Sequence, residues 1–167
     1  MTGITIAYDV TAANYARVPS GQRCGYTTGS PDIAWTLAMW QANPGAVRIC
    51  QDAAASDATA DVLDVEKGAA TPGECAGWVK RALASFAANT RPGQRRPAIY
   101  CSASAVTSVV NALNAGGVIS GVGLWVASWG IGEPAAAGDV LKAAGPFPVI
   151  TEIGMSAGSP VAEVRPS

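Results

Sequence analysis

Short apolar runs alternate along this chain with longer stretches in which apolar residues recur every three or four positions. The first pattern is typical of strands and the second of helices, and their alternation indicates β-α-β units. The runs are continuously apolar, as in parallel strands that are covered on both faces. Six strands are predicted, at Ile4–Val10, Ala46–Cys50, Val62–Glu66, Ala98–Cys101, Gly123–Ser128 and Phe147–Ile153.

Capping residues mark where the helices begin and end. Ser30 and Pro31 have the form of an N-cap and a first helical residue, and Asn43-Pro44-Gly45 ends that helix. Thr71-Pro72-Gly73-Glu74 has the form of a capping box, for a helix that reaches about Asn89. Two more helices are predicted over 104–115 and 135–144, and the Gly- and Ser-rich segment 19–30 is predicted to be a loop.

Together these elements predict an α/β fold with mostly parallel strands. A complete (β/α) barrel has eight strands and takes about 250 residues, whereas this chain has 167. We therefore expect a shortened or irregular (β/α) barrel that occupies residues 1–167 as a single domain. The stretch 154–167 shows little pattern, and we expect it to be a loosely ordered tail.

The composition excludes several classes of function. The sequence has 11 Lys and Arg against 12 Asp and Glu, a net charge of −1, and so lacks the basic excess of a nucleic-acid-binding protein. Its one dense basic run, 91–96, is predicted to be a solvated loop. There is no histidine, which rules out Ser-His-Asp and Cys-His catalysis and histidine metal sites. We expect no metal and no other cofactor.

The chain shows no sign of a membrane segment or a leader. No apolar run reaches the roughly 18 residues of a membrane span, and no signal peptide is visible at the first residues. We expect a soluble protein without membrane insertion. Its place is the cytoplasm, unless it acts on a cell wall after release or as part of a phage particle.

The four cysteines are spaced too widely for a zinc or redox motif. Two disulfides in three connectivities are conceivable for Cys24, Cys50, Cys75 and Cys101, but buried free thiols are the favoured interpretation. In particular, Cys50 and Cys101 end predicted strands, at positions inside the sheet where small apolar side chains pack well. We therefore expect no disulfide bond between them. A thiol-redox function is disfavoured, because no cysteine has a CxxC partner.

The sharpest chemical signal is Asp61-Val62-Leu63-Asp64-Val65-Glu66. Alternate side chains of a strand share a face, so Asp64 and Glu66 are predicted to point the same way. Such a carboxyl pair can divide into an acid and an ionised carboxylate, as glycoside hydrolysis requires. The alternative is a structural pair that caps the next helix or binds Arg48. Asp9 also follows a strand, and its alternative role is that of a turn residue.

Other polar and aromatic residues lie close to predicted strand ends. Asp52 follows the second strand and is either part of the same rim or a turn residue. Tyr100, Trp125 and Trp129 lie at the ends of two further strands, where aromatic rings can stack on sugar rings, although a lone Trp is more often a core residue.

Four segments in this order resemble family 25 glycoside hydrolases, which are lysozyme-type N-acetylmuramidases. The segments are Tyr8-Asp9-Val10, Asp61 to Glu66, Pro97 to Ser102, and Leu124-Trp125-Val126-Ala127. The resemblance spans residues 4 to about 130. It implies an irregular β/α barrel that cleaves the MurNAc–GlcNAc bond of peptidoglycan.

The resemblance also implies roles for individual residues. Glu66 would be the general acid, and Asp64 would orient the N-acetyl group or act as the second carboxylate. Asp9 would be a further acid, with Tyr100 and Trp125 lining the sugar site. The chain departs from the family in the short segment before the Asp-x-Glu strand and in its end, where Glu152 is the candidate for a late acid.

Two functions follow from these observations. The first is a glycoside hydrolase directed at peptidoglycan or a related glycan, from a phage or an actinobacterium. The second is a lysozyme-like module without turnover that binds cell-wall glycan or serves as a structural component of a phage tail, in contact with other virion proteins. The intact Asp9, Asp64 and Glu66 favour the enzyme, and the departures favour the module.

Overall fold

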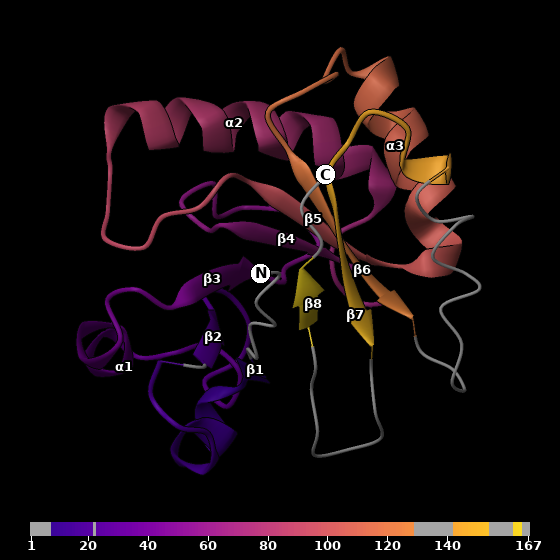
Figure 1. The fold of residues 1–167 in the computed structure, drawn as a ribbon. Coiled ribbons are helices and arrows are strands. Elements are labelled where there is room, and N and C mark those ends of the chain that lie inside the picture. The colour runs from indigo at the N-terminus through magenta and orange to yellow at the C-terminus, as the bar shows by residue number, and fades with distance from the viewer. Residues whose placement is uncertain (1–7, 22, 129–141, 154–161, 165–167) are drawn as a thin grey trace.

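The computed structural model describes residues 8–21, 23–128, 142–153 and 162–164, which form one sheet of eight strands in chain order. The strands are β1 (Tyr8–Val10), β2 (Arg23–Tyr26), β3 (Val47–Cys50), β4 (Val62–Val65), β5 (Ala98–Ser102), β6 (Gly123–Ser128), β7 (Val149–Ile153) and β8 (Ala162–Val164). Strands β1 to β7 are parallel, and β8 runs antiparallel to β7. The sheet curls into a half-barrel (Figure 1), so the predicted shortened α/β barrel is confirmed.

Helices cover the outer face of this sheet (Figure 1). The α-helices are α1 (Leu37–Ala42), α2 (Cys75–Ala88) and α3 (Val106–Ala115), and the short 3-10 helices are η1 (Ala12–Arg17), η2 (Pro72–Glu74) and η3 (Ala103–Ala105). Trp78 of α2 and Leu113 of α3 are fully buried in one core with Leu63, Ile99 and Leu124 of the central strands. This outer core fixes which side chains of β4, β5 and β6 face the helices.

The inner face of the sheet carries a second, smaller core. It contains Cys24, Tyr26, Ile49, Val62 and Ala98, with Tyr100 and Trp125 packed against it. On β4, Val62 belongs to the inner core whereas Leu63 and Val65 belong to the outer one. Strand alternation therefore places Asp64 on the inner face.

The sequence signals for the two longer helices are confirmed. The backbone N–H of Thr71 donates to the Glu74 carboxylate over 3.0 Å, as a capping box requires. The helical segment that follows ends at Ala88. Gly116 follows the last residue of α3, as predicted.

Three sequence predictions differ from the structure. The segment 19–30, predicted to be a loop, contains β2, and the tail 154–167 contains β8. The helix predicted from Ser30 starts only at Leu37, with Thr36 as its N-cap. The helix predicted over 135–144 lies mostly outside the described residues.

Trp35 explains the late start of α1. Its ring lies against Gly25 of β2, and its Nε1–H donates to the Val10 carbonyl over 2.6 Å. Its own N–H donates to the Tyr26 carbonyl, so residues 34–35 extend the sheet beyond the end of β1. Tertiary contacts thus hold in extended form a segment whose local signals indicate a helix.

The basic run 91–96 is not wholly solvated, which corrects the prediction. Asp61 is buried at the start of β4 and forms an ion pair with Arg91. It also accepts the backbone N–H groups of Arg48 and Arg95 over 2.9 and 3.2 Å. A buried carboxylate needs such partners, and here they tie the loop before β5 to β3 and β4.

All four cysteines are buried free thiols. The favoured interpretation from the sequence, and the expected absence of a Cys50–Cys101 bond, are confirmed. Burial raises the pKa of Cys75 and of Cys101 to about 12, so neither thiol is a ready nucleophile near neutral pH.

The contact between Gly25 and Trp35 gives a first testable prediction. A Cβ atom at position 25 would lie 2.3 Å from the Trp35 ring, so Gly25→Ala forces the buried indole to move. We expect a loss of about 1–3 kcal/mol in the free energy of unfolding, measured by urea denaturation. Gly45→Ala is the matched control, because a Cβ there meets no atom within 4 Å. Equal stability of the two variants would contradict the prediction.

Candidate functional site

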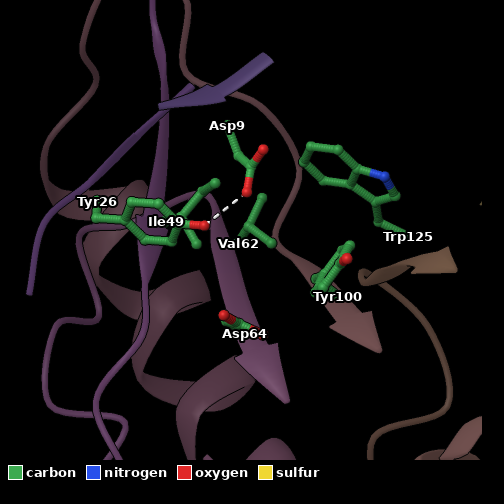
Figure 2. Close-up of a pocket in the computed structure, with 7 residues that line it drawn as sticks. All are labelled: Asp9, Tyr26, Ile49, Val62, Asp64, Tyr100 and Trp125. Atoms are coloured by element: carbon green, nitrogen blue, oxygen red, sulfur yellow. Dashed lines mark hydrogen bonds between the residues drawn. The ribbon is translucent and has the colours of Figure 1, made fainter. Parts of the chain in front are cut away.

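A small pocket lies on the inner face of the sheet (Figure 2). Its lining combines two carboxyl groups with aromatic and aliphatic side chains from six neighbouring strands. The lining residues are Asp9, Tyr26, Ile49, Val62, Asp64, Tyr100 and Trp125. The pocket therefore brings together residues that are more than a hundred positions apart in the chain.

Four residues predicted from the sequence lie in this pocket. Asp64 is opposite Tyr100 in the register of β4 and β5, and Tyr100 is opposite Trp125 in that of β5 and β6. Because paired positions of parallel strands share a face, these three side chains form one row across the sheet. Asp9 joins them from β1.

Asp64 is buried, with 5% of its surface exposed. Burial, followed by the negative charges of Glu66 and Asp9, raises its pKa to about 7. Its Oδ1 atom has no hydrogen-bond partner among the described residues. Near neutral pH this carboxyl group can therefore hold a proton and donate it.

Asp9 is exposed at the opposite side of the pocket. Its Oδ2 atom accepts a hydrogen bond of 2.7 Å from the Tyr26 hydroxyl (Figure 2). Burial, followed by the charge of Asp9, raises the pKa of Tyr26 above its ordinary value, so the phenol stays a donor. The pocket thus contains two carboxyl groups in different environments, one buried and one exposed and bonded to a phenol.

Tyr100 and Trp125 form an aromatic wall. Their ring centroids lie 5.5 Å apart with an interplanar angle of 87°, an edge-to-face pair. In Figure 2 the indole nitrogen of Trp125 lies away from the two carboxyl groups, and the six-membered ring lies on the pocket side. This wall therefore offers apolar ring surface to a ligand.

The other predicted residues lie elsewhere. Glu66 follows the end of β4, is exposed and does not line the pocket, although its charge acts on Asp64. Asp52 lies in the loop after β3, where its carboxylate accepts the Ser56 N–H over 3.0 Å, as in a turn. Glu152 lies on β7 opposite Ala127, and the structure describes only its backbone. Trp129 lies outside the described residues.

Sequence reasoning missed three lining residues. Tyr26 was missed because the segment 19–30 was predicted to be a loop, whereas the structure contains strand β2 there, which ends at Tyr26. Ile49 and Val62 were correctly predicted in strands, but nothing in the sequence showed which strand residues line a pocket. The apolar run around Tyr26 was the one usable signal for this part of the site.

Within the described part of the chain, no three His, Cys, Asp or Glu side chains gather closely enough to hold a metal ion. None of the helices in that part is long and apolar enough to cross a bilayer. No protein-family model, no curated protein and no solved structure matches the chain. Its own geometry is therefore the basis for a functional proposal.

Asp64 gives a prediction about stability. The folded chain binds a proton at Asp64 up to about pH 7, whereas an unfolded chain releases it near its ordinary pKa of about 4. Folding stability is thus lost as the pH rises between these values. Asp64→Asn removes the buried charge, so its stability relative to the wild type should rise between pH 4 and pH 8. We expect this relative gain to reach about 4 kcal/mol at pH 8, because each pKa unit corresponds to about 1.4 kcal/mol.

Asp52→Asn is the matched control for this measurement by thermal denaturation. Burial acts to raise the pKa of Asp52, but the hydrogen bonds from Ser56 outweigh it and hold the pKa below its ordinary value. This carboxylate therefore stabilises the fold above about pH 4, and its replacement should lower stability at pH 8. A pH-independent difference between Asp64→Asn and the wild type would show that Asp64 titrates normally.

Proposed function

We propose that the chain is a glycoside hydrolase that acts on peptidoglycan or a closely related cell-wall glycan. The observation that carries this proposal is the pair of carboxyl groups, Asp64 and Asp9, in one pocket with an aromatic wall. Glycoside hydrolysis uses two carboxyl groups in unlike environments, one that donates a proton and one that stabilises positive charge. The resemblance of four segments to family 25 supports the choice of glycan.

In the proposed reaction, Asp64 is the proton donor. Its proton passes to the bridging oxygen of the glycosidic bond, and the electron pair of the breaking C1–O bond stays on that oxygen. The Asp9 carboxylate stabilises the positive charge that develops at C1 and the ring oxygen. A water molecule then adds its oxygen to C1 and returns a proton to Asp64. General acid assistance of this kind contributes about 10²–10⁴ in rate.

The lining of the pocket suits a sugar, because it combines carboxyl groups with aromatic rings. Tyr100 and Trp125 supply ring surface for the apolar face of that sugar. Oδ1 of Asp64 is buried and has no hydrogen-bond partner among the described residues, so no described group there competes for the proton of this carboxyl group.

Glu66 has a different role in this proposal from the one that the resemblance implies. The resemblance makes Glu66 the general acid, but Glu66 is exposed and lies outside the pocket lining. Its negative charge raises the pKa of Asp64. We therefore assign the proton to Asp64 and a supporting electrostatic role to Glu66.

A second candidate function is a module that binds cell-wall glycan without cleaving it. The position of Glu66 outside the pocket favours this candidate, because the family's acid would then be absent from the site. The pocket and its aromatic wall would still bind a sugar.

Variants of Asp64 and Glu66 test the proposal. Asp64→Asn should reduce the release of reducing ends from purified peptidoglycan by at least about 100-fold at every pH. Wild-type activity should fall as the pH rises through about 7, because Asp64 then loses its proton. Glu66→Gln removes a negative charge, so the pKa of Asp64 falls and this decline should move to lower pH, with activity kept below it.

Two results decide between the alternatives. If Glu66→Gln loses activity at all pH values while Asp64→Asn stays active, Glu66 and not Asp64 is the general acid. Wild-type protein that binds peptidoglycan in a pull-down but releases no reducing ends would establish the binding module. Asp57→Asn is a control for a change of charge outside the pocket, because Asp57 does not line it and its side chain accepts hydrogen bonds from the N–H and the hydroxyl of Thr59.

A further inference from the structure

Tyr26 is the polar pocket residue that this reaction leaves without a role. It is the last residue of β2, its side chain is 9% exposed, and its hydroxyl donates to Asp9. We propose that Tyr26 is a positioning residue, whose phenol holds the Asp9 carboxylate in one orientation toward the sugar. This inference rests on the proposed hydrolysis and extends it to a residue outside the four segments that carry the family resemblance.

The register of β1 and β2 makes the contact possible. Asp9 lies opposite Cys24, so Tyr26 is its diagonal neighbour, two residues along on the same face. Diagonal neighbours are about 7–8 Å apart, a distance that an aromatic side chain can span. The phenol thus reaches back along the sheet to Oδ2 of Asp9, as Figure 2 shows.

Tyr26 is held much more firmly than Asp9. Its carbonyl accepts the Trp35 N–H over 2.9 Å, and the next residue, Thr27, donates its N–H to the Ile49 carbonyl over 2.8 Å. Its ring belongs to the inner core. Asp9, in contrast, is exposed, so core packing does not fix its side chain. The hydrogen bond from the buried phenol therefore restricts the orientation of the carboxylate.

The phenol keeps its proton under the conditions of the reaction. The titratable groups that act on it are Asp9, Asp64 and Tyr100, and all of them, after burial itself, raise its pKa. Tyr26 therefore serves as a hydrogen-bond donor throughout and does not exchange protons with the substrate. Tyr26 contributes by orienting the Asp9 carboxylate, because a small displacement of a reacting group lowers the rate strongly.

If Tyr26 were only structural, Tyr26→Phe would lower stability, whereas a positioning residue affects catalysis and leaves the fold stable. When the hydroxyl of Tyr26 is removed, the exposed Asp9 carboxylate regains water as its partner, so no buried polar group is left unsatisfied. The fold should therefore tolerate Tyr26→Phe, whereas catalysis should not. Tyr15→Phe is the matched control, because the Tyr15 hydroxyl accepts a hydrogen bond from Asn43, outside the pocket lining.

The experiment compares steady-state kinetics on soluble peptidoglycan fragments for the wild type, Tyr26→Phe and Tyr15→Phe. For Tyr26→Phe we expect kcat to fall about tenfold with KM within twofold, because the hydrogen bond acts on the reacting carboxylate. Tyr15→Phe should keep both constants and lose thermal stability. A kcat for Tyr26→Phe within twofold of the wild type would overturn the inference and leave the proposed hydrolysis intact.

A second measurement does not depend on activity. In protein labelled with ¹³C at tyrosine Cζ, the Tyr26 signal should keep its phenol position to higher pH in the wild type than in Asp9→Asn. An unchanged titration in Asp9→Asn would overturn the bond between the two residues. If the wild type hydrolyses no wall preparation, the proposed function fails, and this titration still decides whether Tyr26 holds Asp9.

Discussion

The packing of α2 and α3 against the outer face of β4, β5 and β6 is the constraint on which the rest of the structure depends. Leu63, Ile99 and Leu124 are fully buried in that layer. Since the side chains of a strand alternate, burying these three on one face leaves Asp64, Tyr100 and Trp125 on the other. A shift of one residue would exchange the two sets and expose the outer core. The large apolar layer thus orients the small polar site.

The site itself works against stability. A carboxyl group takes a position on the inner face that an aliphatic residue would fill more favourably, and its pKa of about 7 expresses the free energy of desolvation and of repulsion from Glu66 and Asp9. By contrast, Asp61 on the same segment is compensated by Arg91 and by two backbone N–H groups. Two buried aspartates three residues apart therefore have opposite electrostatic surroundings. The uncompensated one lines the pocket.

The first part of the half-barrel is built without the long helices that cover its centre. In their place, aromatic rings pack in series beside β1, β2 and β3. Trp35 lies between Tyr15 and Trp40, at centroid distances of 5.0 and 4.5 Å. The guanidinium groups of Arg23 and Arg48 lie over the two outer rings. This arrangement covers three short strands with few residues, and it places Asp9 and Tyr26 beside the central strands.

The sequence by itself determined the elements whose signals are local. The capping box at Thr71, the helical periodicity of apolar residues and the continuous apolar runs predicted α2, α3 and most strands, because capping and periodicity act within a few residues. The alternation of Val62 to Glu66 also predicted that Asp64 lies on the face opposite to Leu63 and Val65. Asp9, Tyr100 and Trp125 were candidates because they lie close to the ends of predicted strands.

Only the tertiary structure decided the rest. Strand β2 forms because Gly25 accommodates the Trp35 ring, the Tyr26 carbonyl accepts the Trp35 N–H, and Thr27 donates to the Ile49 carbonyl. These contacts join β2 to residues that are distant in the sequence. Tyr26 becomes part of the site through a register that pairs Asp9 with Cys24. The burial that distinguishes Asp64 from Glu66 depends on the curvature of the sheet and on where β4 ends. Such properties arise from the summed packing of many strands, and no local sequence pattern encodes them.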